Sequence, residues 1–370
     1  MDANTIGYMQ HALALARKGI GLASPNPMVG CVLVRDGQVV GEGFHQYEWR
    51  DHAEVVAIKS AGEKSQGATM YVTLEPCNHS GRTGPCTEAI IKAGIRRVVS
   101  TIQDPNPTVA GRGFERLRVA GLEVFTGVME EQSRLLNEAF AKWVREKLPL
   151  LTLKSAMTLD GQLALPQSGK RKGSPWITSE ESRAEVHRMR HASDALLTGI
   201  GTVLVDDPLL TDRSGLPRRR RLLRVILDSK LRLPPKSRIV KTADDDLLVF
   251  TGAPLQSVKA RALQKARVEV VRVKLRANRV DLHTVLKELG KRDILSVLLE
   301  AGSALNGAAL AADVVDRLFL FYAPTVAGGG HTPFATGVKS RHASLRDVSI
   351  HKFGPDFAIE GILHDVYRNH

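Results

Sequence analysis

Short apolar runs alternate with stretches of helical apolar spacing along nearly the whole chain, and this alternation restricts the fold more than any other feature. A chain of this pattern forms an α/β fold, in which helices cover the faces of sheets. Asp36-Gly37 lies between two apolar runs and predicts a hairpin turn. In the first part we expect strands at 28–35, 38–43, 69–74, 97–102 and 123–126, and helices at 5–18, 52–61, 87–93, 111–120 and 130–147.

Pro149 follows a charged helical stretch and cannot continue a helix, so we place a domain boundary beside it. The 370 residues suit two domains, which we assign to 1–147 and 148–370. The second domain continues the alternation of strands and helices. Its expected strands are 150–157, 195–198, 223–227, 247–250, 268–273, 294–300 and 317–322; its helices are 179–191, 257–265, 281–289 and 303–312; and its exposed loops are 212–222 and 230–246.

The net charge of +13 is distributed unevenly between the two parts. Residues 1–148 contain 17 Lys and Arg against 16 Asp and Glu, so a net charge of +12 lies in the remainder. The densest basic run, Arg218–Arg221, is interpreted as a solvated loop. Basic domains often bind nucleic acid, but aromatic residues are only 5% of the chain and offer no evident platform for stacking bases. A positive field also attracts small phosphorylated molecules.

No apolar run approaches the roughly 20 residues that a membrane span needs. The first residues lack the basic and then apolar pattern of a secretion signal. We therefore expect a cytoplasmic protein with no membrane partner, in which the three cysteines are reduced.

The strongest chemical signal is a histidine and two cysteines at defined spacing. His52 and Glu54 lie at the start of a predicted helix, and Cys77 and Cys86 follow later in the chain. One imidazole and two thiolates are three good zinc ligands, and three protein ligands leave the open position of a catalytic zinc site. Glu54 is not on the same helical line as His52 and is suited to transfer protons. This is the pattern of zinc nucleobase deaminases, whereas Cys31, inside an apolar strand, is expected in the core.

The loop between the two cysteines, residues 78–85, is longer than in the common signature and suits substrate contacts. Arg82 can form paired hydrogen bonds with a phosphate. We interpret His79 as a pocket residue, because a fourth protein ligand would leave no position for water. Cys77 and Cys86 are both expected at or just before a helix start, where a thiolate is favoured.

Eight short segments form one wider pattern along the chain: Asn26-Pro27-Met28-Val29-Gly30, His52-Ala53-Glu54, 75–86 (EPCNHSGRTGPC), Asp104-Pro105-Asn106-Pro107, Asp160-Gly161, Trp176-Ile177-Thr178, Asp206-Asp207-Pro208 and Glu300-Ala301-Gly302. Together these segments resemble the bacterial bifunctional deaminase/reductase of riboflavin biosynthesis. The resemblance implies an α/β protein with an N-terminal cytidine-deaminase-like three-layer domain, followed by a dihydrofolate-reductase-like domain.

For the first domain, the resemblance implies hydrolytic removal of an amine from a pyrimidine that carries a ribosylamino phosphate. One Zn²⁺ per chain would be held by His52, Cys77 and Cys86, and Glu54 would be the catalytic proton carrier. Asn26 and Asp104 also have an alternative interpretation as turn residues beside prolines. The implied substrate-binding residues are Asn26, His45, Arg82 and Asp104.

For the second domain, the resemblance implies reduction of the ribosyl group of the deaminated product to ribityl by NADPH, in a homodimer. From the residues alone, Glu300-Ala301-Gly302 ends an apolar strand and begins a helix, where free N–H groups suit a phosphate; an ordinary turn is the alternative. The implied cofactor contacts are Ala156, Trp176, Thr202, Asp206, Ser229, Gly302, Ser303, Ala304, Leu305, Asn306, Gly307 and Ala308, and the implied substrate contacts are Ser174, Arg190, Leu210, Arg213 and Glu300.

Two other functions fit parts of the sequence. The first is a zinc deaminase that acts on a base in tRNA or DNA, with the basic second part as an accessory domain; its activity would depend steeply on salt. The second is a zinc-binding scaffold without activity, in which Glu54 would have no role.

Overall fold

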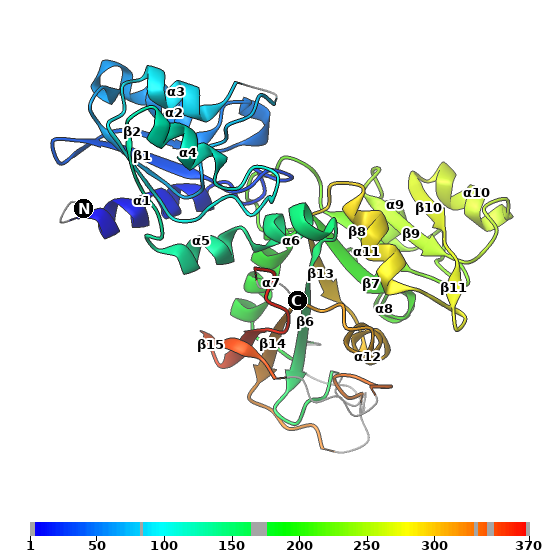
Figure 1. Cartoon of the computed structure of the whole chain (residues 1–370). Coiled ribbons are helices and arrows are strands. Elements are labelled where there is room, and N and C mark those ends of the chain that lie inside the picture. The colour runs from blue at the N-terminus through cyan, green and yellow to red at the C-terminus, as the bar shows by residue number, and fades with distance from the viewer. Residues whose placement is uncertain (1–3, 82–83, 164–175, 329–331, 339–343, 368–370) are drawn as a thin grey trace. The chain divides into compact units, whose positions relative to one another are not determined.

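Two large sheets organise the computed structural model, which describes residues 4–81, 84–163, 176–328, 332–338 and 344–367. The chain divides into two units (Figure 1). Unit 1 comprises Met1–Lys147, Pro217–Arg220 and Val366–His370, and unit 2 comprises Leu148–Leu216 and Arg221–Asp365.

The sheet of unit 1 has five strands in the order β2-β1-β3-β4-β5. The first two form the predicted antiparallel hairpin, and Asp36 and Gly37 at its turn both have positive φ, as the tight hairpin turn requires. β1 is also antiparallel to β3, and β3, β4 and β5 are parallel. The strands are β1 (Gly30–Arg35), β2 (Gln38–Phe44), β3 (Thr69–Val72), β4 (Arg97–Ser100) and β5 (Glu123–Phe125).

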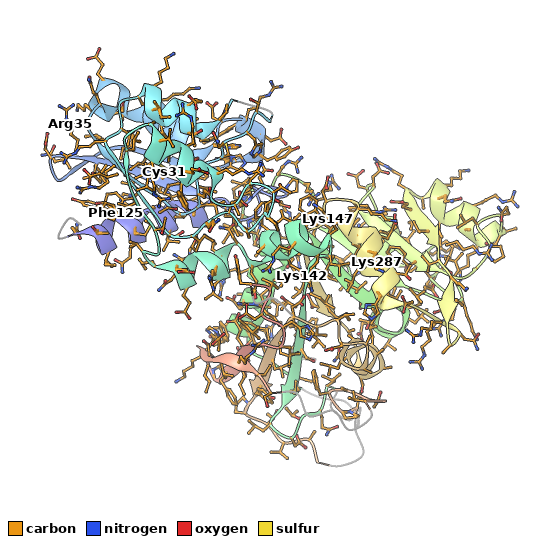
Figure 2. All side chains as sticks on the ribbon, in the orientation of Figure 1. Cys31, Arg35, Phe125, Lys142, Lys147 and Lys287 are labelled. Carbon is orange, nitrogen blue, oxygen red and sulfur yellow. The ribbon has the colours of Figure 1, made fainter. Side chains whose placement is uncertain are left out.

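Alternate side chains of β1 enter different cores, which makes unit 1 a three-layer structure. Cys31 and Leu33 pack with residues of α2 (Ala53–Ala61), α3 (Cys86–Lys92) and α4 (Arg112–Val119). Val32 and Val34 pack with residues of α1 (Thr5–Arg17) on the other face. Cys31 is fully buried on β1, as expected of a core residue (Figure 2).

The single helix expected over 130–147 is two helices, α5 (Glu130–Leu136) and α6 (Glu138–Glu146). The break is at Asn137, which is almost completely buried. Its side-chain oxygen accepts a hydrogen bond from the backbone N–H of Met28 at 2.8 Å, and its amide nitrogen donates to the carbonyl of Met28 at 3.0 Å. Because these hydrogen bonds join Asn137 to backbone far away in the sequence, the spacing of apolar residues could not predict the break.

The sheet of unit 2 has nine strands in the order β10-β9-β8-β7-β13-β6-β14-β16-β15. The first seven are parallel, and the last two form an antiparallel hairpin that sequence patterning did not predict. The strands are β6 (Leu150–Thr158), β7 (Ala195–Gly199), β8 (Leu223–Leu227), β9 (Leu247–Thr251), β10 (Val268–Arg272), β13 (Ser296–Glu300), β14 (Arg317–Ala323), β15 (Arg346–Phe353) and β16 (Asp356–Ile362), with a separate small pair, β11 (Leu275–Arg276) and β12 (Arg279–Val280).

Helices pack on both faces of this sheet, as in α/β folds. Residues of α11 and α12 belong to one core, and residues of α8, α9 and α10 belong to another. Ser179, Ser257 and Asp281 cap α7, α10 and α11 by accepting a backbone N–H. The helices are α7 (Glu180–Ala192), α8 (Ile200–Asp206), α9 (Arg238–Lys241), α10 (Val258–Lys265), α11 (Leu282–Gly290) and α12 (Ser303–Ala311).

The interpretation of 230–246 as an exposed loop is wrong. This segment contains α9, and Leu231, Leu233, Ile239 and Val240 are buried in the core that contains residues of α8 and α10. The apolar residues of this segment have no regular spacing, so the sequence pattern did not predict that they are buried. Across the described part of the chain, no helix has both the length and the apolar character needed to cross a membrane.

Candidate zinc and reductase sites

His52, Cys77 and Cys86 come together in unit 1. Nδ1 of His52 is 3.5 Å from Sγ of Cys77 and 3.2 Å from Sγ of Cys86. The ligand atoms of all three residues lie within 4.8 Å of one another. One nitrogen and two sulfur atoms at this separation form a donor set that suits Zn²⁺, so the residues fit the metal that their pattern predicts.

Three different elements supply these side chains. His52 precedes the first residue of α2, and Cys86 is the first residue of α3, as expected. Cys77 lies in the loop after β3 and not at the start of a helix, so that part of the prediction is wrong. The start of α3 nevertheless points at it, because the N–H of Cys86 donates to Sγ of Cys77 at 3.4 Å. Hydrogen bonding with Cys86 and then His52 lowers the pKa of Cys77 to about 4, which favours the thiolate that a metal needs.

Glu54 is in the first turn of α2 and is almost completely buried. Burial raises the pKa of its carboxyl group, and the positive charge of His52 opposes this effect. The cluster of ligand atoms contains His52, Cys77 and Cys86 without Glu54. Glu54 is therefore close to the three predicted zinc ligands but is not one of them.

Asn26 and His45 lie next to this cluster. Nδ2 of Asn26 is 3.0 Å from Nε2 of His45, and Nδ1 of His45 is 3.3 Å from the carbonyl of Asp51. The rings of His45 and His52 meet edge to face, with centroids 5.2 Å apart. Two of the predicted substrate-binding residues are therefore in contact with each other, and one touches a predicted zinc ligand.

Glu75 holds the segment that carries Asp104, and the sequence analysis assigned it no role. Its buried carboxylate accepts hydrogen bonds from the backbone N–H groups of Asp104 at 3.0 Å, Gly111 at 2.9 Å and Gly113 at 2.8 Å. The segment that carries Asp104 is thus tied to the residue two positions before Cys77. The sequence feature that could have indicated this role is the position of Glu75 directly before Pro76 and Cys77.

The side chain of Asp104 is partly buried. Its Oδ1 accepts the N–H of Asn106 at 2.8 Å, as in a turn, so the turn-forming interpretation also fits. Burial raises its pKa to about 6, and the charge of Glu75 adds to this. Arg82, like Ser174 of the second domain, lies outside the described residues.

In unit 2, several predicted cofactor residues lie where parallel strands end. Thr202 follows β7, Ser229 follows β8 and Gly302 follows β13, while Ala156 is on β6. These strands are neighbours in the order β8-β7-β13-β6, so their carboxyl ends share one edge of the sheet. Ligands of α/β proteins bind at such edges.

The start of α12 fits a phosphate group. Gly302 precedes its first residue and provides no side-chain cap. Oγ of Ser303 and Oδ1 of Asn306 are buried without a hydrogen-bond partner in the part of the chain that the structure describes. A Cβ atom added at Gly199, the last residue of β7, would lie 3.4 Å from Leu305, so this helix start lies beside the end of β7. Free helix N–H groups at this edge suit a cofactor phosphate.

Glu300 is the centre of a buried ion cluster. Its carboxylate receives two hydrogen bonds from Arg190, at 2.6 and 3.0 Å, and Nζ of Lys154 is 3.6 Å away. Burial alone would raise the pKa of Glu300, but Lys154 and then Arg190 lower it to about 2. The sequence analysis missed Lys154, although a lysine inside the apolar strand Leu150–Thr158 was a visible signal.

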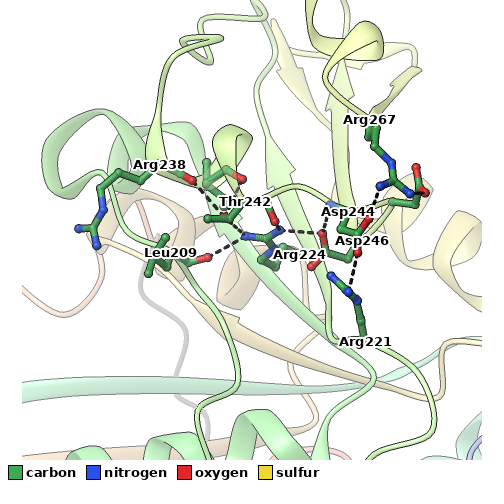
Figure 3. A network of polar contacts seen from close by, with 10 residues as sticks. Leu209, Arg221, Arg224, Arg238, Thr242, Asp244, Asp246 and Arg267 are labelled. Atoms are coloured by element: carbon green, nitrogen blue, oxygen red, sulfur yellow. Dashed lines mark hydrogen bonds and ion pairs between the residues drawn. The ribbon is translucent and has the colours of Figure 1, made fainter.

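The segment with Leu210 and Arg213 is joined to this cluster, because Nη1 of Arg190 donates to the carbonyl of Thr211 at 3.1 Å. Leu210 is buried with a positive φ, and Arg213 is exposed. The buried Arg224 also holds this segment, through a hydrogen bond to the carbonyl of Leu209. Figure 3 shows the guanidinium of Arg224 bonded to the carbonyl of Leu209, to Thr242 and to Asp246.

Trp176 and Asp206 are two further predicted cofactor residues. The indole of Trp176 is 61% exposed, with Arg183 5.8 Å from its ring. Asp206 is the exposed last residue of α8.

Known protein families match both parts of the chain. The cytidine and deoxycytidylate deaminase zinc-binding region matches residues 3–102, and the RibD C-terminal domain matches residues 149–359. The riboflavin biosynthesis protein RibD of Aquifex aeolicus is 42% identical over 355 residues, which cover 95% of this chain and 96% of the relative. RibD of Escherichia coli is 44% identical over 337 residues, which cover 87% and 88%.

Solved structures agree over the full length. A RibD structure from Acinetobacter baumannii has a TM-score of 0.86 and 35% identity, and the match covers 98% of this chain and 99% of the other. A Thermotoga maritima structure described as a diaminohydroxyphosphoribosylaminopyrimidine deaminase/5-amino-6-(5-phosphoribosylamino)uracil reductase has a TM-score of 0.81 and 37% identity, covering 97% and 99%.

The fold, the ligand cluster and these matches define a deaminase with a zinc-binding region fused to a reductase. More particularly, the chain belongs to the RibD family of riboflavin biosynthesis proteins. It is a bifunctional deaminase and reductase, and the RibD C-terminal domain matches its basic second part.

Proposed function

We propose that this enzyme deaminates diaminohydroxyphosphoribosylaminopyrimidine and then reduces the ribosyl group of the resulting phosphoribosylaminouracil to ribityl. The observation that carries the first step is the His52, Cys77 and Cys86 cluster with the buried Glu54 beside it. The Thermotoga maritima relative, whose description names both activities, supports the choice of substrate. We assign the deaminase to 1–147 and the reductase to 148–370.

In the deaminase, His52, Cys77 and Cys86 would hold one zinc ion per chain, which would supply the Lewis acid that activates water. Glu54 accepts a proton from the attacking water and delivers it to the leaving amine, which departs as ammonia. The remaining roles are in substrate binding. Asn26, His45 and Asp104 contact the pyrimidine, and Arg82 contacts the phosphate.

In the reductase, the chain would bind and orient NADPH, which would supply the hydride when bound. The start of α12, Gly302–Ala308, holds a cofactor phosphate, and Glu300 and Arg190 bind the substrate. The other proposed contacts follow the resemblance. They are Ala156, Trp176, Thr202, Asp206 and Ser229 for the cofactor, and Ser174, Leu210 and Arg213 for the substrate.

We further propose a homodimer in the cytoplasm, acting on a small phosphorylated pyrimidine without a nucleic-acid or membrane partner. Most soluble oligomers are symmetric dimers, and reduced thiols persist in the cytoplasm. Activity that changes little between low and moderate salt would support the small substrate, because phosphate-backbone binding is steeply salt-dependent.

The test uses purified protein of known zinc content and the diamino pyrimidine substrate, with and without NADPH. We expect ammonia release without NADPH, and NADPH oxidation only after deamination. Ammonia release without subsequent oxidation would contradict the reductase assignment. If zinc-replete protein released no ammonia, the proposed deaminase substrate would be wrong.

A further inference from the structure

Four residues from the middle of the reductase sequence belong to unit 1. Pro217–Arg220 are part of unit 1, whereas Leu216 before them and Arg221 after them belong to unit 2. The sequence analysis interpreted this basic run as a solvated loop. That interpretation is wrong for Arg219, whose side chain is only 21% exposed.

Arg219 and Arg220 hold the segment 21–24 of the deaminase. The backbone N–H of Arg219 donates to the carbonyl of Gly21 at 2.8 Å. Nη1 of Arg219 donates to the carbonyl of Ser24 at 2.9 Å, and Nη2 of Arg220 is 3.0 Å from the hydroxyl of Ser24. Two consecutive residues therefore make three hydrogen bonds to one short loop.

The same guanidinium also reaches a second segment. Nε of Arg219 is 2.8 Å from Oε1 of Glu48, and the guanidinium carbon lies 3.7 Å from the centroid of the Tyr47 ring. The backbone N–H of Tyr47 in turn donates to the carbonyl of Leu22 at 3.2 Å. Arg219 thus joins the segment 21–24 to the segment 47–48 by a cation over an aromatic ring and an ion pair.

Both segments lead directly to proposed substrate-binding residues. Asn26 lies two residues after Ser24, and His45 lies two residues before Tyr47. Nδ2 of Asn26 and Nε2 of His45 are 3.0 Å apart, and the ring of His45 meets that of His52. A group that fixes 21–24 against 47–48 therefore fixes the spacing between Asn26 and His45.

We infer that Arg219 is a positioning residue of the deaminase, although its place in the sequence is within the reductase. It acts through Asn26 and His45 and does not touch the pyrimidine itself. The inference rests on the proposed substrate-binding role of these two residues.

The last arginine of the run provides a matched control. Arg221 belongs to unit 2 and pairs with Asp244 at 2.5 Å, as Figure 3 shows. Its side chain is 65% exposed. Arg221→Gln changes the same charge two positions away from Arg219 without touching the deaminase segments.

The test compares full-length Arg219→Gln, Arg219→Lys, Glu48→Gln and Arg221→Gln with the natural protein. Deamination and reduction are measured separately, the latter on the deaminated compound. We expect Arg219→Gln to raise the KM of deamination about tenfold with kcat, zinc content and reduction nearly unchanged, because charged hydrogen bonds to the loop are lost. Arg219→Lys and Glu48→Gln should give smaller increases in KM, and Arg221→Gln none.

Hydrogen exchange provides a readout that does not depend on the substrate. Arg219→Gln should speed amide exchange in residues 20–27 and 45–51, and Arg221→Gln should not. An unchanged KM together with unchanged exchange would overturn the inference. So would joint loss of both activities with loss of zinc, since that result indicates a general folding defect. If the natural protein fails to deaminate the proposed substrate but exchange responds as expected, the proposed substrate fails and the positioning role stands.

Discussion

The zinc-ligand cluster of unit 1 and the ion cluster of unit 2 both place ionisable groups out of water, but with different partners. In unit 1, two thiols and the carboxyl of Glu54 gather around one imidazole. In unit 2, the carboxylate of Glu300 lies between two cations, Lys154 and Arg190. The first arrangement gains its compensating charge when a metal binds, whereas in the second the charge of Glu300 is compensated by side chains of the chain itself. A change such as metal removal can therefore affect the site of unit 1 and leave the site of unit 2 unchanged.

Metal removal should divide the two activities most sharply. We expect a chelator to remove nearly all deaminase activity and to leave reduction of the deaminated compound intact, because Glu300 is compensated by side chains. Ammonia release, NADPH oxidation and zinc content are measured on the same sample, and added zinc should restore deamination. Equal loss of both activities would contradict the expectation that only the site of unit 1 depends on the metal.

Glu54→Gln should separate catalysis from metal binding within unit 1. We expect deamination to fall at least about 100-fold, the usual contribution of a proton-transferring group, with zinc retained. Zinc analysis and the rate of ammonia release check this. Full activity would assign Glu54 no catalytic role, and loss of zinc would place it among the ligands.

Lys154→Met should show how much the internal compensation of unit 2 contributes. Glu300 keeps its two hydrogen bonds from Arg190 but loses the second cation. We expect unit 2 to lose about 2 kcal/mol of unfolding free energy, as when one partner of a buried polar group is removed. Urea unfolding followed by a probe of unit 2 measures the loss. Lys287→Met, on an exposed position of α11, is the control and should change little. Equal stability of both variants would contradict the role of Lys154.

A smaller effect is expected at the half-buried His364 of unit 2. Nε2 of His364 is 2.9 Å from Asp313 and Nδ1 is 3.5 Å from Asp316, and hydrogen bonding with Asp316 raises the pKa of the imidazole. Its stabilisation is complete below the unfolded pKa and is lost as pH rises through the folded one. His364→Gln should therefore flatten the decline in the thermal midpoint of unit 2 above about pH 6.5. An unchanged slope would contradict this.

The two sites also differ in how far the sequence could predict them. Zinc chemistry demands particular residue types, so His52, Cys77 and Cys86 stand out at their spacing. A helix start binds phosphate through backbone N–H groups, which almost any residue supplies, so the segment at Gly302 was ambiguous without a resemblance.

Supporting residues were the hardest to predict. Glu75 and Lys154 act through partners about 30 and 150 positions away, and periodicity says nothing about such pairs. The β15–β16 hairpin was missed because β15 is mostly exposed and has no apolar run. The alternation of apolar runs nevertheless predicted both layered folds, because burial of one face is a local property of each element.

Unit 1 is discontinuous in sequence, and this has a consequence for how the protein is made. Domains usually fold in order as they leave the ribosome. Here the hydroxyl of Tyr367 donates to the carbonyl of Arg134 at 3.0 Å, and Arg145 donates to the carbonyl of Val366 at 2.5 Å. The first unit to emerge during translation therefore gains its last contacts only after residue 367 has been synthesised, so the order of synthesis is not the order of completion.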